Sequence, residues 1–227
     1  MLKKLIHDLA HENITLSQGL TRGKIIGATI KNDTFTKWVT QELSGYDLTT
    51  TSLPDYRKLK SNLYLSFRIN GAREDVPIEI PFDCPTLHDL VEYLRVYDPI
   101  SSIESSLETI PTPTLAAHFD KKRSDLVFTA IEKLEPKFTA YKSHFSFVLQ
   151  VCTKTQYREI IETAKQSFLD TLLKLDEEFP DLSDRFDYNR ENAQKVNNIV
   201  NNFIYGNHSP LTLAVGNEVI QQSSSLK

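Results

Sequence analysis

The chain lacks several features that mark specialised protein classes. It has two cysteines among 227 residues, Cys84 and Cys152, and no CxxC pair. Without a cysteine framework, free thiols in a reducing compartment are the simplest interpretation. No run approaches the roughly 18 apolar residues of a membrane span. The opening MLKKLIHDLAHENI meets Asp8 before an apolar stretch can build, so we expect no secretory signal. A cytoplasmic protein without a membrane partner is expected.

A surplus of positive charge is also absent. Lysine and arginine number 26 against 30 aspartates and glutamates, which gives a net charge of −4. Proteins that bind nucleic acid in general carry a basic surplus, because phosphate neutralisation supplies most of their affinity. The composition therefore does not favour nucleic acid as a partner, although a net value leaves room for a local patch.

Glycine is scarce, with seven residues, and three of them are regularly spaced. Gly19, Gly23 and Gly27 are four residues apart in a helix expected to start near Thr15, so they share one face. Each glycine costs a helix about 0.5–1 kcal/mol relative to alanine. The spacing predicts that another backbone packs closely against this face.

Apolar periodicity predicts a mainly helical chain. Helical spacing covers residues 2–13 and 33–44, and a helix with uncertain ends is expected over 115–134. The clearest helix is 154–178, where Thr153 and Gln156 form a capping box.

Three segments instead alternate with the period of a strand: 63–69, 76–82 and 145–151. Asn70-Gly71 predicts a tight turn between the first two. Pro77 and Pro81 cannot donate ladder hydrogen bonds, so the second strand should lie at an edge. The fold class expected is α+β, predominantly helical, with a small antiparallel sheet and a short β-rich C-terminal tail.

The end of the chain differs in composition, with eight asparagines in residues 189–217. We therefore divide the chain into an α+β domain, 1–186, and an asparagine-rich helix and β tail, 187–227. Short β segments with alternating apolar residues pair readily with copies of themselves. A homo-oligomer is expected, with contacts from Ile199, Phe203, Tyr205, Leu213 and Val215.

Two short motifs in the first third carry a resemblance. WVTQELSGY runs from Trp38 to Tyr46, and LPDYR runs from Leu53 to Arg57. Together they resemble the AbiTii domain, found in bacterial proteins linked to abortive-infection defence against phage. The matching positions are Trp38, Glu42, Leu43, Gly45, Tyr46, Pro54, Tyr56 and Arg57. The resemblance implies a defence context and brings no catalytic residues with it.

The motif residues have two interpretations. Glu42, Tyr46, Tyr56 and Arg57 could form a recognition surface for a partner. Alternatively they form a buried latch in which Glu42 pairs with Arg57, since guanidinium matches a carboxylate, and the tyrosines pack over Trp38. Packing explains most aromatic clusters, so the latch is favoured.

Other candidate sites are weaker. His7 and His11 have a spacing that can bind metal, but no third ligand is evident, so we predict no metal and no cofactor. Lys121, Lys122 and Arg123 near His118 could touch phosphate, but such a run is more often a solvated face or helix end.

These features suggest two functions. The first is a defence component that acts through self-assembly or protein–protein interaction, alone or with a partner protein of the same system, without catalysis. The alternative is a toxic effector enzyme such as a nuclease. No arrangement of residues predicts a catalytic site.

Overall fold

The computed structural model describes residues 1–50, 53–80, 87, 91–182 and 186–206. The helices there are α1 (Leu2–Ala10), α2 (Leu16–Ile30), α3 (Asp33–Ser44), α5 (Ile100–Thr109), α6 (Lys121–Leu134), α7 (Lys154–Glu178) and α8 (Arg190–Val200). Shorter 3₁₀ or π turns are η1 (Asp55–Arg57), η2 (Pro136–His144) and η3 (Asn201–Tyr205). The strands are β1 (Lys58–Lys60), β2 (Asn62–Ile69), β3 (Ala72–Ile78), β4 (Tyr93–Arg95), β5 (Thr114–His118) and β6 (Phe145–Thr153).

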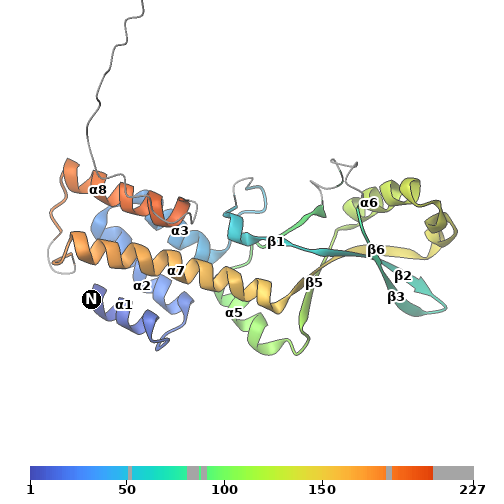
Figure 1. The fold of residues 1–227 in the computed structure, drawn as a ribbon, viewed down its shortest axis with the longest axis horizontal. Helices are drawn as coiled ribbons and strands as arrows, with labels where there is room; N and C mark the ends of the chain where they lie inside the picture. Colours follow the sequence, from blue (N-terminus) through green and yellow to red (C-terminus); the bar gives the residue numbers. More distant parts are fainter. Residues whose placement is uncertain (51–52, 81–86, 88–90, 183–185, 207–227) are drawn as a thin grey trace, which may run out of the picture.

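The molecule is elongated, with helices gathered at one end and a sheet at the other (Figure 1). We call the first part the helical body; it contains α1, α2, α3, α5, α7 and α8. The second part, the sheet body, is an antiparallel sheet in the order β3-β2-β6-β5 with α6 and η2. A separate antiparallel pair joins β1 to β4. This arrangement confirms the α+β class with helices predominating; the predicted β segments after residue 206 lie outside the described residues.

Each body has its own apolar core. In the helical body, α7 turns Ile160, Ala164, Phe168, Leu172 and Leu175 inward, as its periodicity predicts. Its Thr153–Gln156 capping box also forms. Each of the larger side chains, from isoleucine, leucine and phenylalanine, contributes about 1.5–3 kcal/mol when fully buried. The helical body therefore assembles around the apolar stripe of α7.

The glycine face of α2 packs differently from the prediction. A Cβ at Gly19 would meet the Leu9 side chain at 2.6 Å, and one at Gly23 would meet the Phe168 ring at 2.8 Å. Only at Gly27 is a neighbouring backbone atom near, the Thr36 Cα at 3.6 Å. The three glycines thus make room for side chains from three helices, not for one backbone.

The strands confirm the predicted hairpin and correct one helix. β2 and β3 pair antiparallel around Asn70 and Gly71, both at positive φ, and β3 lies at the sheet edge as Pro77 predicts. The expected helix 115–134 is wrong in its first residues, because 114–118 form β5 and pair with β6. The helix starts only after Asp120, whose side chain caps the Arg123 amide.

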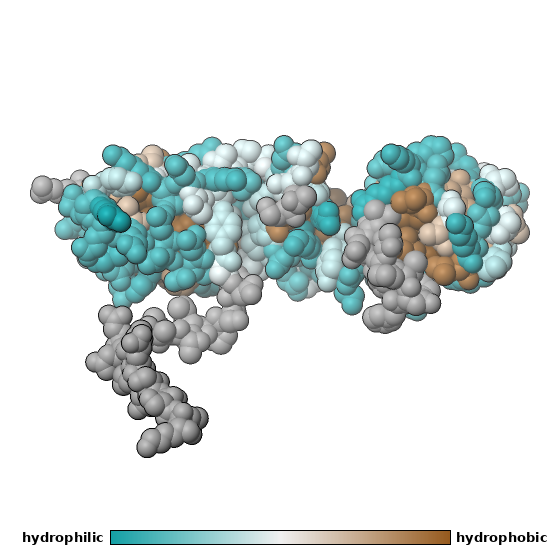
Figure 2. All heavy atoms as spheres, turned by 90° about the horizontal axis from the view of Figure 1, so that it is seen from above, coloured by the Kyte–Doolittle hydropathy of each residue, from teal (hydrophilic) through white to brown (hydrophobic). Residues whose placement is uncertain are grey.

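Only one face of the four-stranded sheet carries helical cover in the described part of the chain. Leu65 and Phe67 of β2 and Val148 of β6 point into the sheet core, together with Val127 and Phe128 of α6. The alternate residues of the same strands point to the other side, where Figure 1 shows no helix. Viewed from the α6 side, apolar atoms gather on the sheet body more than on the helical body (Figure 2).

Helix α8 packs onto the helical body. Val196, Ile199, Val200 and Ile204 belong to the same core as α7. The Asn32 side chain, which caps α3, donates to the Asn197 Oδ1 at 2.6 Å. The division of the chain after residue 186 stays a prediction, and the helix that follows it shares the helical core.

Candidate functional site

The two motifs meet in space at the end of α3. Trp38, Glu42 and Tyr46 lie on successive turns of α3 and just after it, while Tyr56 and Arg57 lie on η1, directly before β1. Gly45 ends α3 with φ of +83°, a conformation that suits glycine. A Cβ at Gly45 would lie 2.8 Å from the Tyr97 carbonyl oxygen. A larger residue here would push α3 away from the chain that follows β4.

Glu42 and Arg57 form the buried ion pair that the latch interpretation predicts. Arg57 Nη2 donates to Glu42 Oε2 at 2.5 Å, and Arg57 Nε donates to Glu42 Oε1 at 3.3 Å. Both side chains are 0% exposed. The fork of the guanidinium thus meets both carboxylate oxygens, the geometry in which such a pair is strongest.

Both tyrosines donate to the same carboxylate. Tyr46 and Tyr56 hydroxyls each lie 2.6 Å from Glu42 Oε1. Trp38 Nε1 then donates to the Tyr56 oxygen at 3.1 Å. Tyr46 does not pack over Trp38; its ring lies under the Arg57 guanidinium, 4.8 Å from ring centroid to Cζ. The five side chains therefore form one continuous hydrogen-bonded network, which we call the motif cluster.

The motif cluster also holds the segment after β4. Arg57 Nη1 donates to the carbonyls of Val96 and Asp98, at 3.2 and 2.7 Å. The Tyr46 amide donates to the Tyr97 carbonyl at 2.8 Å. These bonds join α3 to the β1–β4 pair, which lies between the helical body and the sheet (Figure 1).

Burial sets the protonation of the cluster. It raises the pKa of Tyr46 well above 10.0, and the Glu42 carboxylate raises it further. The pKa of Tyr56 is raised for the same two reasons. Burial works against the Arg57 cation, but Glu42 outweighs that effect, so the pKa of Arg57 is raised. Both phenols stay protonated, so they act as donors to Glu42.

The motif cluster is a buried structural contact that holds η1 against α3. The side chains of Glu42 and Arg57 are 0% exposed, and Trp38 is 1% exposed. Of the predicted interaction residues, Gly45, Pro54 and Tyr56 are partly exposed and the others are buried. A role for the motif residues in binding a partner stays a prediction, while the contacts account for them as architecture.

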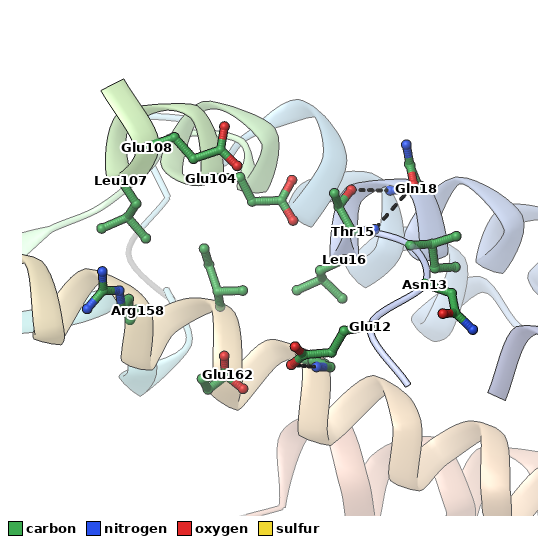
Figure 3. A pocket seen from close by; sticks show the side chains of 13 residues that line it. Glu12, Asn13, Thr15, Leu16, Gln18, Glu104, Leu107, Glu108, Arg158 and Glu162 are labelled. Atoms are coloured by element: carbon green, nitrogen blue, oxygen red, sulfur yellow. Dashed lines mark hydrogen bonds and ion pairs between the residues drawn. The ribbon is translucent and has the colours of Figure 1, made fainter. Parts of the chain in front are cut away.

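A polar groove opens elsewhere in the helical body, between the α1–α2 turn, α5 and α7 (Figure 3). Its volume is about 460 Å³. Glu104 and Glu108 project from α5, and Arg158 and Glu162 from α7. Lys165 Nζ lies 2.9 Å from Glu12 Oε1, and this contact lowers the pKa of Glu12. Ser17 Oγ donates to Glu104 at 2.7 Å, so part of the acidic lining is already bonded.

The residues predicted for self-assembly differ in their exposure to solvent. Ile199 is 6% exposed and contributes to the helical core, Phe203 is half-buried, and Tyr205 is 51% exposed. Leu213 and Val215 lie outside the described residues. A second groove of about 390 Å³ lies between α7 and α8, with Ile199 and Phe203 in its lining. Its other lining residues are Lys174, Glu178, Lys195, Asn198 and Asn202.

The histidine pair, the basic run and the cysteines were the remaining candidate sites. The His7 and His11 rings lie 4.4 Å apart, and no group of three His, Cys, Asp or Glu side chains suited to a metal occurs within the described ranges. Lys121 pairs with Asp125 in the first turns of α6, and Arg123 stacks over Phe119 at 4.0 Å. Cys84 lies outside the described residues, whereas Cys152 is buried and its thiol pKa is raised to about 11 by that burial.

None of the helices in the described part of the chain combines the length and apolar character needed to cross a membrane. A comparison with curated proteins and with solved structures gave no significant match. The AbiTii family model matches residues 1–201, which include both motifs, the sheet body and α8. This span exceeds the region that the motifs alone indicated. The chain therefore belongs to the AbiTii family, whose name associates it with abortive infection.

Proposed function

We propose that this protein is a component of abortive-infection defence against phage that acts through self-assembly. The proposed contact surface runs from about residue 199 to residue 221. It combines the α7–α8 groove, Tyr205 and the apolar positions Leu213 and Val215 of the following segment. A second copy of the chain is the partner.

The observation that carries this proposal is the groove between α7 and α8. Phe203 in its lining is half-buried, and Tyr205, one residue before Gly206, is 51% exposed. Aromatic residues that combine a large apolar surface with a polar tip are enriched where proteins meet. The segment that begins at Gly206 starts beside this surface, so groove and segment can contribute to the same contact.

Light scattering coupled to size-exclusion chromatography tests the proposal. The full chain should elute as an oligomer, and a chain ending at Gly206 should be a monomer that retains the helical circular-dichroism signal. Tyr205→Ser should weaken the oligomer. Tyr188→Ser is the matched control, since Tyr188 is also 51% exposed. Monomeric full-length protein at concentrations up to the solubility limit would overturn the proposal.

A plaque assay links assembly to defence. Cells that express the full chain should reduce phage plating, and cells that express the chain ending at Gly206 should not. If the shortened chain protects equally well, assembly through this segment is not the mechanism. Induced expression that kills uninfected cells and degrades their nucleic acid would instead favour the effector-enzyme alternative.

A further inference from the structure

The sheet face opposite α6 carries a defined set of side chains. The register places Arg68 opposite Arg73, Ser66 opposite Asp75, and Tyr64 opposite Pro77 on β2 and β3. On the inner strands Phe147 pairs with Ser66, and Leu149 lies between Tyr64 and His118. Because alternate residues of a strand share a face, these side chains lie on the side away from the sheet core. We call this surface the open face; Ser66 and Leu149 are buried in it, and its accessible members are Tyr64, Arg68, Arg73, Asp75, Phe147 and His118.

Aromatic and planar cationic groups are adjacent at its centre. The ring of Phe147 lies 4.4 Å from that of His118 and 5.1 Å from the Arg73 guanidinium carbon. Phe147 and Tyr64 are half-buried, and His118 is exposed. A row of flat groups thus runs across all four strands of the sheet and can be reached from solvent.

One of the two arginines on this face has an ion-pair partner and the other has none within the described residues. Arg73 is held by Asp75 through two hydrogen bonds, at 2.9 and 2.8 Å. Arg68 is exposed and makes no ion pair within the described residues. Two like charges directly opposite each other on neighbouring strands destabilise a sheet. Asp75 already neutralises Arg73, so an anion that bound beside Arg68 would neutralise the positive charge that remains on this face.

We propose that the open face binds single-stranded nucleic acid, with the phosphates beside Arg68 and Arg73 and a base stacked at Phe147 and His118. Single strands bind proteins through basic side chains along the backbone and through bases that stack on aromatic rings or guanidinium planes. The open face offers both kinds of group within one patch. This inference does not depend on the proposed assembly, because the residues lie in the other body.

The net charge of −4 argues against general binding to duplex backbone but has little bearing on a local site. Exposed charges beyond about 8–10 Å are screened at physiological ionic strength. An acidic peptide would also satisfy the arginines, yet it would leave the adjacent aromatic rings without a role. Single-stranded nucleic acid is therefore the partner that uses all of the observed groups.

Fluorescence anisotropy with the full chain tests the proposal. The probes are labelled single-stranded RNA and DNA of mixed sequence, about 12 nucleotides long, which covers one site of this kind. Wild-type protein should bind at least one probe at low salt, and affinity should fall as salt rises. Phe147→Leu should weaken binding by about tenfold. Arg68→Gln should weaken it and lower the salt slope by about one.

Lys122→Gln is the matched control, since it removes one positive charge from α6, which covers the opposite face. It should leave affinity and salt slope unchanged, and thermal melts should confirm that all variants fold. Absence of binding by the wild type at low salt would overturn the proposal. So would binding that Phe147→Leu leaves intact, or equal competition by polyglutamate, which would identify a surface that recognises charge alone.

Discussion

Glu42 is the residue on which the motif cluster depends. Its carboxylate accepts from Tyr46, Tyr56 and Arg57, so three donors converge on one buried anion. A buried ion pair adds little stability relative to an apolar replacement of the pair, because desolvation offsets the attraction. Its main physical effect is directional, because the hydrogen bonds join side chains of η1 to a carboxylate on α3. The cluster therefore determines how the helical body meets the β1–β4 pair.

Glu42→Gln should destabilise the protein by about 3–5 kcal/mol, because it leaves the Arg57 cation buried without its partner. Urea denaturation of both proteins measures this difference. Asp125→Asn is the control, since it breaks an exposed pair with Lys121 and should cost no more than about 1 kcal/mol. Equal effects of the two changes would mean that the Glu42–Arg57 pair is not desolvated in solution.

The raised pKa values of Tyr46 and Tyr56 predict a loss of stability at alkaline pH. Above the ordinary value of 10.0 the unfolded chain releases these protons and the folded chain keeps them. The unfolded state then binds fewer protons, so the free energy of unfolding falls as pH rises. The contribution is complete below pH 10 and decreases above it.

Denaturation between pH 8 and about pH 11 measures this slope. The double change of Tyr46 and Tyr56 to Phe should make the decline above pH 10 shallower. Tyr141→Phe, a change of the same kind at a tyrosine that is 46% exposed, is the control. A decline that is equally steep in the double variant would contradict the assignment.

Among the elements, α2 shows most clearly how packing overrides local preference. Its three glycines weaken it as an isolated helix, yet each lies where a neighbouring side chain enters. At Gly23 that neighbour is Phe168, which also contacts Phe35 and Trp38, with ring centroids 6.1 and 6.0 Å away. The glycine allows this aromatic group from α7 to reach α3 across α2.

Gly23→Ala should therefore lower stability, although alanine is the better helix former. The added methyl would lie 2.8 Å from the buried Phe168 ring, and overpacking costs about 1–3 kcal/mol against a propensity gain of about 1 kcal/mol. Thr21→Ala, on the exposed side of the same helix, gains propensity without a clash and should not destabilise. A higher melting temperature for Gly23→Ala would show that Phe168 moves aside freely.

At the scale of the whole molecule, α8 and η3 complete the apolar core of the helical body. Val200 and Ile204 are 0% and 7% exposed in the same core as α7, although they lie within the asparagine-rich stretch. The helical core therefore extends to within two residues of Gly206. A truncation that removes these residues changes folding as well as any surface.

A chain ending at Asn198 should melt at a clearly lower temperature than one ending at Gly206. It loses Ile199, Val200 and Ile204 from the core, and each buried side chain contributes about 1.5–3 kcal/mol. Differential scanning calorimetry of the two chains and the full-length protein makes the comparison. If all three melt together, the residues from Ile199 to Gly206 do not contribute to the stability of the helical body.

Local patterns in the sequence determined much of this protein. Capping at Thr153 and the Asn70-Gly71 turn depend on residues close in the chain, and both lie where they were predicted. The Glu42–Arg57 ion pair could also be predicted from the sequence, because a carboxylate and a guanidinium in neighbouring motifs are suitable partners for each other.

Tertiary structure alone decided the rest. Residues 114–118 form a strand because they pair through backbone hydrogen bonds with β6. Their own preferences do not exclude a helix. The open face unites Arg68, Arg73, Phe147 and His118 from four strands, and register is a property of strand pairing that no single segment encodes. Contacts of long sequence separation arise from the packing of whole elements, so the groups that they bring together could not be predicted from spacing.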